Sequence, residues 1–285
     1  MIADEASWPR ARLDADYTAR ACCSVEDFER TIGAYHHYTE AALAAPGTRP
    51  GVVYDPQRGL ALDLYGTVPG ESRPLVMFIH GGYWRALSRG HSGFMAPMLA
   101  ARGIATAAID YRLAPGASMT EIVEDVRRAL AFLWHGAGDL GIDRSRIIAT
   151  GSSAGGHLVG TLMQPGWQQG LGLPDQPLHA ALPVSGLFEL APIAKSHVQE
   201  WMALSPAEVA TFSPLRHLPA RKPPKMLVAV AETETSGFHR QSEAYAKALD
   251  APMLRVAGRH HFDVILDMMD ATTRLGSALV SLTRP

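Results

Sequence analysis

Five short apolar runs recur along this chain of 285 residues, and stretches with helical periodicity separate them. The runs lack the alternation of polar and apolar side chains that a half-exposed strand shows, which favours strands that are buried on both faces. Strands of this kind form a mostly parallel sheet covered by helices, so we predict an α/β fold. The runs are VMFIH at 76–80, IATAAID at 104–110, RIIATG at 146–151, HAALPVSG at 179–186 and KMLVAVA at 225–231.

The clearest helix signal lies at 118–121, where the sequence SMTE places Glu121 three residues after Ser118. A serine followed at that distance by a glutamate forms a capping box, in which each side chain satisfies a free backbone N–H group at the start of a helix. We therefore expect a helix that packs one apolar stripe on the sheet. The stripe consists of Ile122, Val126, Leu130 and Leu133.

The whole chain, 1–285, is interpreted as one α/β domain with two additions. Residues 1–50 are expected to be an N-terminal helical segment, whose main helix begins at a capping Ser24. Residues 187–224 carry scattered apolar side chains interrupted by prolines, and we expect a small cap over the edge of the sheet. The stretch GVVYDPQRGLALDLYG at 51–66 predicts two antiparallel strands at the leading edge of the sheet.

The composition excludes several kinds of partner. Lys and Arg number 26 against 28 Asp and Glu, so no basic surface is available to hold a nucleic acid. The two cysteines, Cys22 and Cys23, are adjacent and are not expected to bridge to each other. No stretch approaches the roughly 20 apolar residues of a membrane span, and the N-terminus does not resemble a secretion signal. We expect a cytoplasmic protein without membrane contact. Its oligomeric state stays open, with a homo-oligomer among the alternatives.

The sequence GSSAGG at 151–156 fits the G-x-S-x-G nucleophile elbow, a strained turn between a strand and a helix. Gly151 and Gly155 flank this turn because a side chain at either place would clash with neighbouring backbone. The central serine, Ser153, points its hydroxyl out of such a turn and is the predicted nucleophile. Ser152 is the alternative, although a small polar residue that fills the turn explains it better.

A serine nucleophile needs a base within hydrogen-bond reach and a carboxylate that orients the base, in the chain order Ser, acid, His. The acid is expected after the strand at 225–231, where Glu232 and Glu234 compete. Periodicity does not separate the two glutamates, because both lie beyond the strand. We favour Glu234, which lies further past the strand, where the chain has turned toward the histidine loop.

The base is expected in RHHFDV at 259–264, where His260 and His261 compete. Phe262 beside His261 would shield that imidazole from water and help it remain neutral near pH 7, so we favour His261. Asp263 is expected to cap a single helix with the sequence DVILDMMDATTRLGSAL, because a carboxylate at a helix start accepts free N–H groups.

The sequence HGGYWR at 80–85 directly follows a buried strand and predicts an oxyanion hole. Its glycines allow the backbone to approach a substrate, so we assign the hole to the N–H groups of Gly82 and Tyr83, joined by that of Ala154. His80 is expected to brace the loop by hydrogen bonds rather than to act in catalysis.

Metal and nucleotide chemistry have no support in the sequence. The chain has 12 histidines but neither H-E-x-x-H nor a spaced Cys/His set, so no metal site is predicted. Glycine-rich stretches such as GGHLVG do not follow the G-x-G-x-x-G pattern after a strand. No cofactor is expected, and the partner is a small-molecule substrate.

Six segments together resemble the α/β-hydrolase branch that contains kynurenine formamidase (arylformamidase). HGGYW is the most specific of them, because hormone-sensitive-lipase-like esterases usually have a third glycine where this chain has Tyr83. The similarity extends from about residue 62 to the last helix. The segments are HGGYW at 80–84, DYRLAP at 110–115, GSSAGGHL at 151–158, SGLFEL at 185–190, FHRQSEAY at 238–245 and HHF at 260–262.

The resemblance implies an α/β-hydrolase fold with the nucleophile at Ser153, the acid at Glu234 and the base at His261. It also implies hydrolysis of N-formyl-L-kynurenine to kynurenine and formate. A carboxylesterase for short-chain or aryl esters is the alternative function and shares every catalytic residue. A non-catalytic ligand-binding protein is a third hypothesis, which the complete triad disfavours. Aromatic side chains that we expect against the substrate are Tyr83 and Trp84, with Trp201 and Phe188 as weaker candidates.

Overall fold

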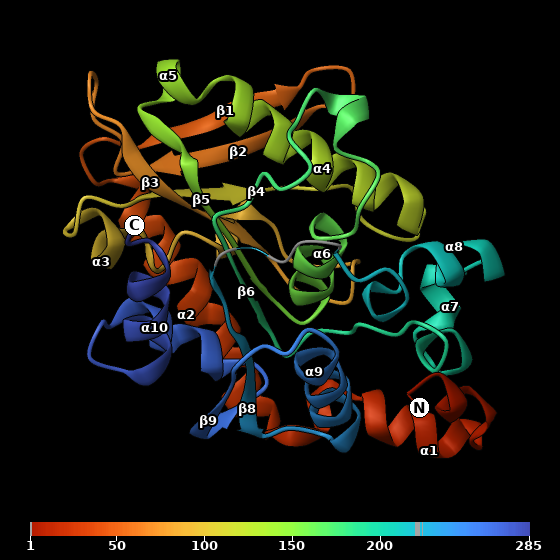
Figure 1. Cartoon of the computed structure of the whole chain (residues 1–285). Helices are drawn as coiled ribbons and strands as arrows, with labels where there is room; N and C mark the ends of the chain where they lie inside the picture. The colour runs from red at the N-terminus through yellow and green to blue at the C-terminus, as the bar shows by residue number, and fades with distance from the viewer. Residues whose placement is uncertain (1, 220–222, 224) are drawn as a thin grey trace.

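A nine-stranded sheet forms the centre of the computed structural model, which describes residues 2–219, 223 and 225–285 (Figure 1). The strands follow the order β1-β2-β4-β3-β5-β6-β8-β9, with the short β7 beside β6. Their bounds are β1 Arg49–Asp55, β2 Leu60–Tyr65, β3 Arg73–Ile79, β4 Ala105–Ile109, β5 Ile142–Ser152, β6 Ala180–Val184, β7 Lys225–Met226, β8 Val228–Thr233 and β9 Met253–His260.

All neighbouring strands from β4 to β9 pair in parallel, whereas β1 and β2 form an antiparallel hairpin that joins the sheet antiparallel to β4. Each of the five apolar runs contributes a strand of the parallel part. The predicted α/β-hydrolase fold is therefore confirmed, and so is the hairpin at the edge of the sheet.

Helices cover both faces of the sheet. The α-helices are α1 Arg10–Tyr17, α2 Val25–Leu43, α3 Ala96–Ala100, α4 Met119–His135, α5 Ala137–Leu140, α6 Ala154–Leu162, α7 Gln199–Met202, α8 Pro206–Thr211, α9 Ser236–Ala248 and α10 Arg274–Leu282. Short 3-10 helices are η1 Ile2–Ser7, η2 Ala19–Cys22, η3 Arg89–His91, η4 Gln169–Leu171, η5 Ile193–Lys195, η6 Pro214–Arg216 and η7 Asp263–Met269.

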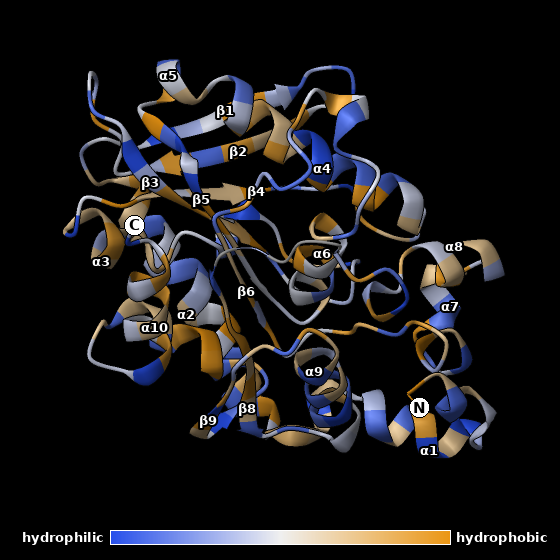
Figure 2. Ribbon diagram, in the orientation of Figure 1, coloured by the Kyte–Doolittle hydropathy of each residue, from blue (hydrophilic) through white to orange (hydrophobic). Residues whose placement is uncertain are grey.

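Successive side chains of a strand enter two different cores, because they point to opposite faces of the sheet. In β3, Met77 and Ile79 pack with residues of α4, α6 and α9, whereas Val76 and Phe78 pack with residues of α2, α3 and α10. This double burial is why the strands lack polar alternation in the sequence. In Figure 2 hydrophobic colouring is prominent on β8, and blue residues are frequent on α4 and α9.

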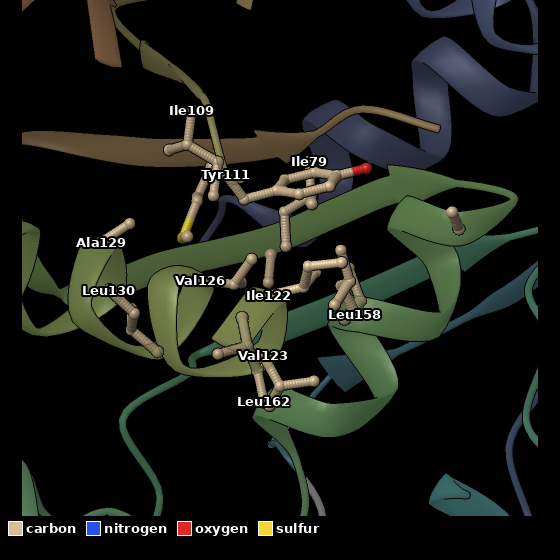
Figure 3. Packing of buried hydrophobic residues seen from close by; sticks show 14 of the residues in the cluster. Ile79, Ile109, Tyr111, Ile122, Val123, Val126, Ala129, Leu130, Leu158 and Leu162 are labelled. Carbon is tan, nitrogen blue, oxygen red and sulfur yellow. The ribbon is translucent and has the colours of Figure 1, made fainter. Parts of the chain in front are cut away.

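Helix α4 confirms the prediction from the capping box. The hydroxyl of Ser118 accepts the N–H of Glu121, and the Glu121 carboxylate accepts the N–H of Ser118 at 2.9 Å. All four residues of the predicted stripe are fully buried. Figure 3 shows part of this core, with α4 beside residues of β3, β4 and α6. Each such side chain contributes about 1.5–3 kcal/mol of transfer free energy.

The chain after β9 differs from the prediction of one helix capped by Asp263. It forms the 3-10 helix η7 and then α10, whose N-cap is Thr273, with Oγ1 accepting the N–H of Gly276 at 3.0 Å. The carboxylate of Asp263 instead accepts the N–H of His260 at 2.7 Å. The prediction was wrong because Asp263 already lies inside the helical turn, where its side chain reaches back to the preceding turn.

The two additions to the sheet contain helices within their described residues. In the N-terminal segment, α2 begins as predicted after Ser24, whose hydroxyl accepts the N–H of Asp27 at 3.0 Å. The segment at 187–224 contains η5, α7, α8 and η6, and its residues 220–222 and 224 lie outside the described part of the chain. Among the described residues, no helix has the length and apolar character that crossing a bilayer requires.

Candidate active site

Ser153 occupies a strained turn between β5 and α6. Its φ of 57° and ψ of −117° are unfavourable for a residue with a side chain. An added Cβ at Gly151 would lie 2.5 Å from the carbonyl oxygen of Ile79, and one at Gly155 would lie 2.0 Å from the same atom. Both glycines of the elbow are therefore required by the close approach of β3, which is the reason that the sequence suggested.

Ser152 and Ser153 both line the same cavity, but their backbones differ. Ser152 is the last residue of β5 and pairs in register with Val184 of β6. Ser153 lies beyond the strand and is the N-cap of α6, so its hydroxyl is next to the N-terminal end of a helix dipole. The dipole favours a negative charge at this position.

Glu234 and His261 form a buried pair. Nδ1 of His261 lies 2.8 Å from Oε2 of Glu234, and the two side chains are 3% and 0% exposed. The other carboxylate oxygen accepts the backbone N–H of Ala231 at 2.8 Å and the hydroxyl of Ser185. Since a carboxylate only accepts, Nδ1 of His261 carries the proton and Nε2 is left as the basic nitrogen of the neutral ring.

The competing glutamate and histidine have other partners. Glu232 is exposed, and its carboxylate accepts the N–H of Gly258 at 2.7 Å. Nδ1 of His260 accepts the N–H groups of Phe262 and Asp263 at 3.2 and 3.3 Å. Of the two candidate pairs, the structure brings together the one that the sequence favours.

Two aromatic rings flank His261. The ring of Phe238 lies 4.3 Å from the imidazole, and that of Phe262 lies 5.1 Å from it, both measured between centroids. Ser153 and His261 line the same cavity, although no hydrogen bond joins their side chains among the described residues. Catalytic hydrogen bonds of this kind are often long in a free enzyme and shorten when substrate binds.

The loop after β3 has three successive residues in the left-handed region. The φ angles are 94° at Gly82, 50° at Tyr83 and 57° at Trp84. A Cβ at Gly82 would lie 2.3 Å from the carbonyl oxygen of Ala86. Within the described chain, the backbone N–H groups of Gly82, Tyr83 and Ala154 donate to no protein acceptor, which leaves them available to a ligand.

His80 braces this loop, as the sequence suggested. Its Nδ1 lies 2.9 Å from the carbonyl oxygen of Gly81, and its ring stacks on Tyr111 with a centroid distance of 4.1 Å. The Tyr111 hydroxyl donates to the carbonyl of His80 at 2.9 Å. Burial lowers the pKa of His80 to about 4, so the ring is neutral at physiological pH.

A cavity of about 430 Å³ contains the candidate residues Ser153, His261, Gly82 and Tyr83. The sequence left two roles open for the N-terminal segment, part of the entrance or a cover of the sheet, and the structure places this segment in one wall of the cavity. The signal for it was an apolar stripe at helical spacing on α2. The lining residues from this segment are Thr18, Ala19, Arg20, Phe28, Ile32 and Tyr35.

The expectation that Trp84 contacts the substrate is wrong. Its side chain is fully buried, packs edge-on against His157 of α6 at 5.1 Å and is not part of the cavity wall. Phe188 is also buried, stacked on Tyr245 at 3.9 Å. Tyr83 and Trp201 do line the cavity, so two of the four aromatic candidates remain.

Cys22, Cys23 and His260 form a group whose possible ligand atoms lie within 4.8 Å of one another. Both cysteines are free thiols, as their adjacency predicts. Burial raises the pKa of the Cys22 thiol to about 12, so a metal ion would have to displace this proton in order to bind the thiolate. Nδ1 of His260 already accepts two backbone N–H groups. The chemistry of this group therefore does not favour a metal.

Comparison with named proteins places the chain among hydrolases. A kynurenine formamidase of Salmo salar is 31% identical over 262 residues, which cover 88% of this chain and 87% of the fish protein. A kynurenine formamidase of Danio rerio is 31% identical over 272 residues, 91% of this chain and 90% of its own. Esterase LipC of Mycobacterium tuberculosis is 34% identical over 113 residues, 39% of this chain and 28% of that esterase.

A family model and solved structures agree with these relatives. The BD-FAE family model matches residues 62–168, which include the elbow and the HGGYW loop. A crystal structure of a thioesterase candidate from Silicibacter sp. TM1040 superposes with a TM-score of 0.80 and 25% identity, covering 94% of this chain and 98% of that chain. A Pyrobaculum calidifontis esterase gives a TM-score of 0.68 with 20% identity, covering 96% of each chain, and shares the fold.

The resemblance inferred from the HGGYW and GSSAGG segments is thus confirmed by relatives that match along nearly the full length of both chains. The activities named for these relatives are hydrolytic, and so is the chemistry of this chain. The chain belongs to the kynurenine formamidase family of α/β-hydrolases.

Proposed function

We propose that the chain is a serine hydrolase that removes a small acyl group by a Ser153–His261–Glu234 triad, with N-formylkynurenine as the substrate. The observation that carries the proposal is the convergence of three features on one cavity. These are the strained Ser153 at the elbow, the His261 imidazole paired with a buried carboxylate, and the backbone N–H groups of Gly82, Tyr83 and Ala154, which have no acceptor in the described chain.

The geometry supports a two-step reaction. Nε2 of His261 takes the hydroxyl proton of Ser153 while Oγ attacks the formyl carbon, and the imidazolium that forms is stabilised by Glu234. The N–H groups of Gly82, Tyr83 and Ala154 bind the oxyanion of the tetrahedral intermediate. His261 then donates its proton to the departing aryl amine, which leaves a formyl ester on Ser153. Water activated by His261 attacks this ester and releases formate.

The cavity is suited to a small acyl group joined to an aromatic body. Its volume of about 430 Å³ lies in the range of roughly 300–1,000 Å³ that is common for small-molecule sites. Its walls are largely apolar and aromatic, with contributions from α2, from the HGGYW loop and from α7. A formyl group needs little room beside the oxyanion hole, so the remaining space is available to the leaving amine.

Segment 187–224 is proposed as a cap of this cavity. His197 and Trp201 from it line the wall, and Nε1 of Trp201 donates to the carbonyl of Tyr83 at 3.1 Å. The cap is thereby fixed to the loop that holds the proposed oxyanion hole.

A carboxylesterase is the second candidate function, which the similarity to Esterase LipC and to esterase structures favours. The two functions share every catalytic residue, so only turnover separates them. The test compares kcat/KM for N-formylkynurenine and for 4-nitrophenyl acetate with the same preparation. Hydrolysis of the formamide supports the proposal, and ester hydrolysis without detectable formamide hydrolysis contradicts it. Absence of either reaction would favour a non-catalytic ligand-binding protein.

A further inference from the structure

The cavity has an uneven charge distribution. Its described wall contains two arginines, Arg20 and Arg85, and neither aspartate nor glutamate. His197, also in the wall, has Nδ1 3.4 Å from the carboxylate of Asp14. The Glu234 carboxylate is fully buried and is hydrogen-bonded to His261 and to the backbone N–H of Ala231. It therefore does not face the cavity as a free negative charge. A cavity with two cations and no facing carboxylate attracts an anionic substrate.

Arg85 is the arginine of this cavity whose guanidinium has no hydrogen-bond partner in the described part of the chain, whereas neither arginine forms an ion pair there. Its side chain is exposed and makes neither a hydrogen bond nor an ion pair with any residue in the described part of the chain. Its guanidinium lies 3.7 Å from the centroid of the Trp201 ring. Stacking on an aromatic face leaves the N–H donors at the edge of a guanidinium free to bind a carboxylate.

Arg20 is more fully engaged. Its Nη1 donates to the carbonyl groups of Cys23 and Ser24 at 3.2 and 3.1 Å, and the guanidinium lies 4.5 Å from the ring of Phe28. These bonds tie Arg20 to the turn before α2, so we assign recognition of an anion to Arg85.

Arg85 is held in a fixed relation to the proposed oxyanion hole. Its backbone N–H donates to the carbonyl of Gly82 at 3.0 Å, within the turn that carries the hole. Trp201, on which the guanidinium rests, donates to the carbonyl of Tyr83 at 3.1 Å. One short segment therefore sets the distance between the scissile carbonyl and the bound anion, and this prearrangement lowers the entropic cost of binding.

We infer that Arg85 is a specificity-determining residue that binds a carboxylate on the leaving group of the substrate. The inference rests on the proposed function, because a formyl group carries only hydrogen and the anion must then belong to the amine or alcohol that leaves. Arg85 lies away from the reacting bond, so it contributes binding energy equally to the ground state and the transition state. Removal of the Arg85 guanidinium is therefore expected mainly to raise KM, with little change in kcat.

The test uses two acetate esters of equal size, 4-acetoxybenzoate and 4-acetoxybenzamide, which differ in charge. The measured quantity is the ratio of their kcat/KM values, so intrinsic chemical reactivity cancels between variants. Arg85→Gln is expected to lower the preference for the anionic ester about fivefold, the scale of one solvent-exposed ion pair. The change should appear in KM and should diminish at high salt. Arg85→Lys should recover part of the preference.

Arg144→Gln is the matched control. Arg144 is exposed, has no ion pair among the described residues and lies 6.0 Å from the ring of Trp134. It belongs to the beginning of β5, whereas Ser153 follows the end of that strand. This variant should keep the wild-type preference.

The results of this test decide between the inference about Arg85 and its alternatives. A lower preference in Arg85→Gln with an unchanged one in Arg144→Gln supports the inference. An unchanged preference in Arg85→Gln, or a loss confined to Arg20→Gln, overturns the inference. If the protein also hydrolyses N-formylkynurenine, the proposed function is left intact. If neither these esters nor N-formylkynurenine is hydrolysed, the proposed function itself fails, and the inference fails with it.

Discussion

The carboxylate of Glu234 lies 2.8 Å from Nδ1 of His261, although 27 residues separate them in the chain. The register of β8 and β9 produces this contact, because the last residues of the two strands, Thr233 and His260, pair with each other, and Glu234 and His261 directly follow them. An irregularity in β9 precedes it, at Gly258, whose N–H donates to Glu232. Glu232 thus stabilises the bulge in β9, whereas Glu234 contacts His261, which follows the bulge.

Glu234→Gln is expected to lower kcat by about 10³- to 10⁴-fold, because the imidazolium loses its counter-charge. The matched variant is Glu232→Gln, which keeps an oxygen that can accept the N–H of Gly258 and should cost less than about tenfold. Steady-state kinetics with 4-nitrophenyl acetate measures both. A larger loss from Glu232→Gln would show that the acid is misassigned.

Ser153→Ala and His261→Ala are each expected to lower kcat by at least about 10⁴-fold, and the double variant should be little worse than either single one. Such non-additivity is the signature of residues that act as a unit. Ser152 lines the cavity but pairs with Val184 through its backbone in the sheet, so Ser152→Ala should retain most of the activity. Activity that survives in Ser153→Ala and disappears in Ser152→Ala would assign the nucleophile to the other serine.

Gly82→Ala tests the proposed oxyanion loop. The added methyl would lie 2.3 Å from the carbonyl oxygen of Ala86 at a φ of 94°, so the loop must shift. A displaced donor costs about 10²- to 10³-fold in kcat.

The control for Gly82→Ala is Gly33→Ala in α2. There the added Cβ meets no described atom within 4 Å beyond the backbone of its own helix, and the backbone is helical. That variant should gain roughly 0.5–1 kcal/mol in the free energy of unfolding with unchanged kcat. Circular dichroism during thermal unfolding verifies that Gly82→Ala is folded at the assay temperature. Full activity in folded Gly82→Ala would contradict the assignment.

The buried His157 is expected to lower the free energy of unfolding in acid. It is fully buried, its Nε2 is 2.8 Å from the carbonyl oxygen of Phe212, and burial lowers its pKa from 6.5 to about 4. Below pH 6.5 His157 is protonated in the unfolded chain but stays neutral in the folded chain. The free energy of unfolding therefore falls as the pH falls from about 6.5 toward 4. One such histidine contributes about 2–3 kcal/mol to this fall.

The measurement is urea denaturation at pH 7.5 and at pH 4.5. His157→Gln can keep a hydrogen-bond donor to Phe212 but cannot titrate, so the difference between the two pH values should shrink. His37→Gln, at an exposed position of α2, should leave the difference as in the wild type. An unaltered pH dependence in His157→Gln would refute the role given to this ring.

Local patterns were sufficient to predict the sheet, α4 and the elbow. Double burial removes polar alternation from strands, a capping box marks a helix start, and the glycines at 151 and 155 are required by the close approach of β3. Each of these signals depends on a few neighbouring residues or on burial alone. The proposed order of nucleophile, acid and base was then predicted from the chain order of the strands.

What the sequence did not predict depends on distant parts of the chain or on the direction of a side chain. The N-terminal wall of the cavity required α2 to dock beside the HGGYW loop, and no local signal specifies a partner at that range. Trp84 follows two residues with positive φ, so its ring points into the core rather than into the cavity. Asp263 was predicted as a helix cap because its carboxylate precedes an apolar stretch. The 3-10 helix η7 in fact begins at Asp263, so the N-cap position is one residue earlier, at Phe262.

The most direct test of the central claim is to locate the covalent adduct that a fluorophosphonate forms with the native protein, by mass spectrometry of its peptides. We expect a single adduct on Ser153, whose formation is greatly slowed by His261→Ala because the hydroxyl then lacks its base. An adduct on another residue, or no adduct on protein that hydrolyses acyl substrates, would contradict the account.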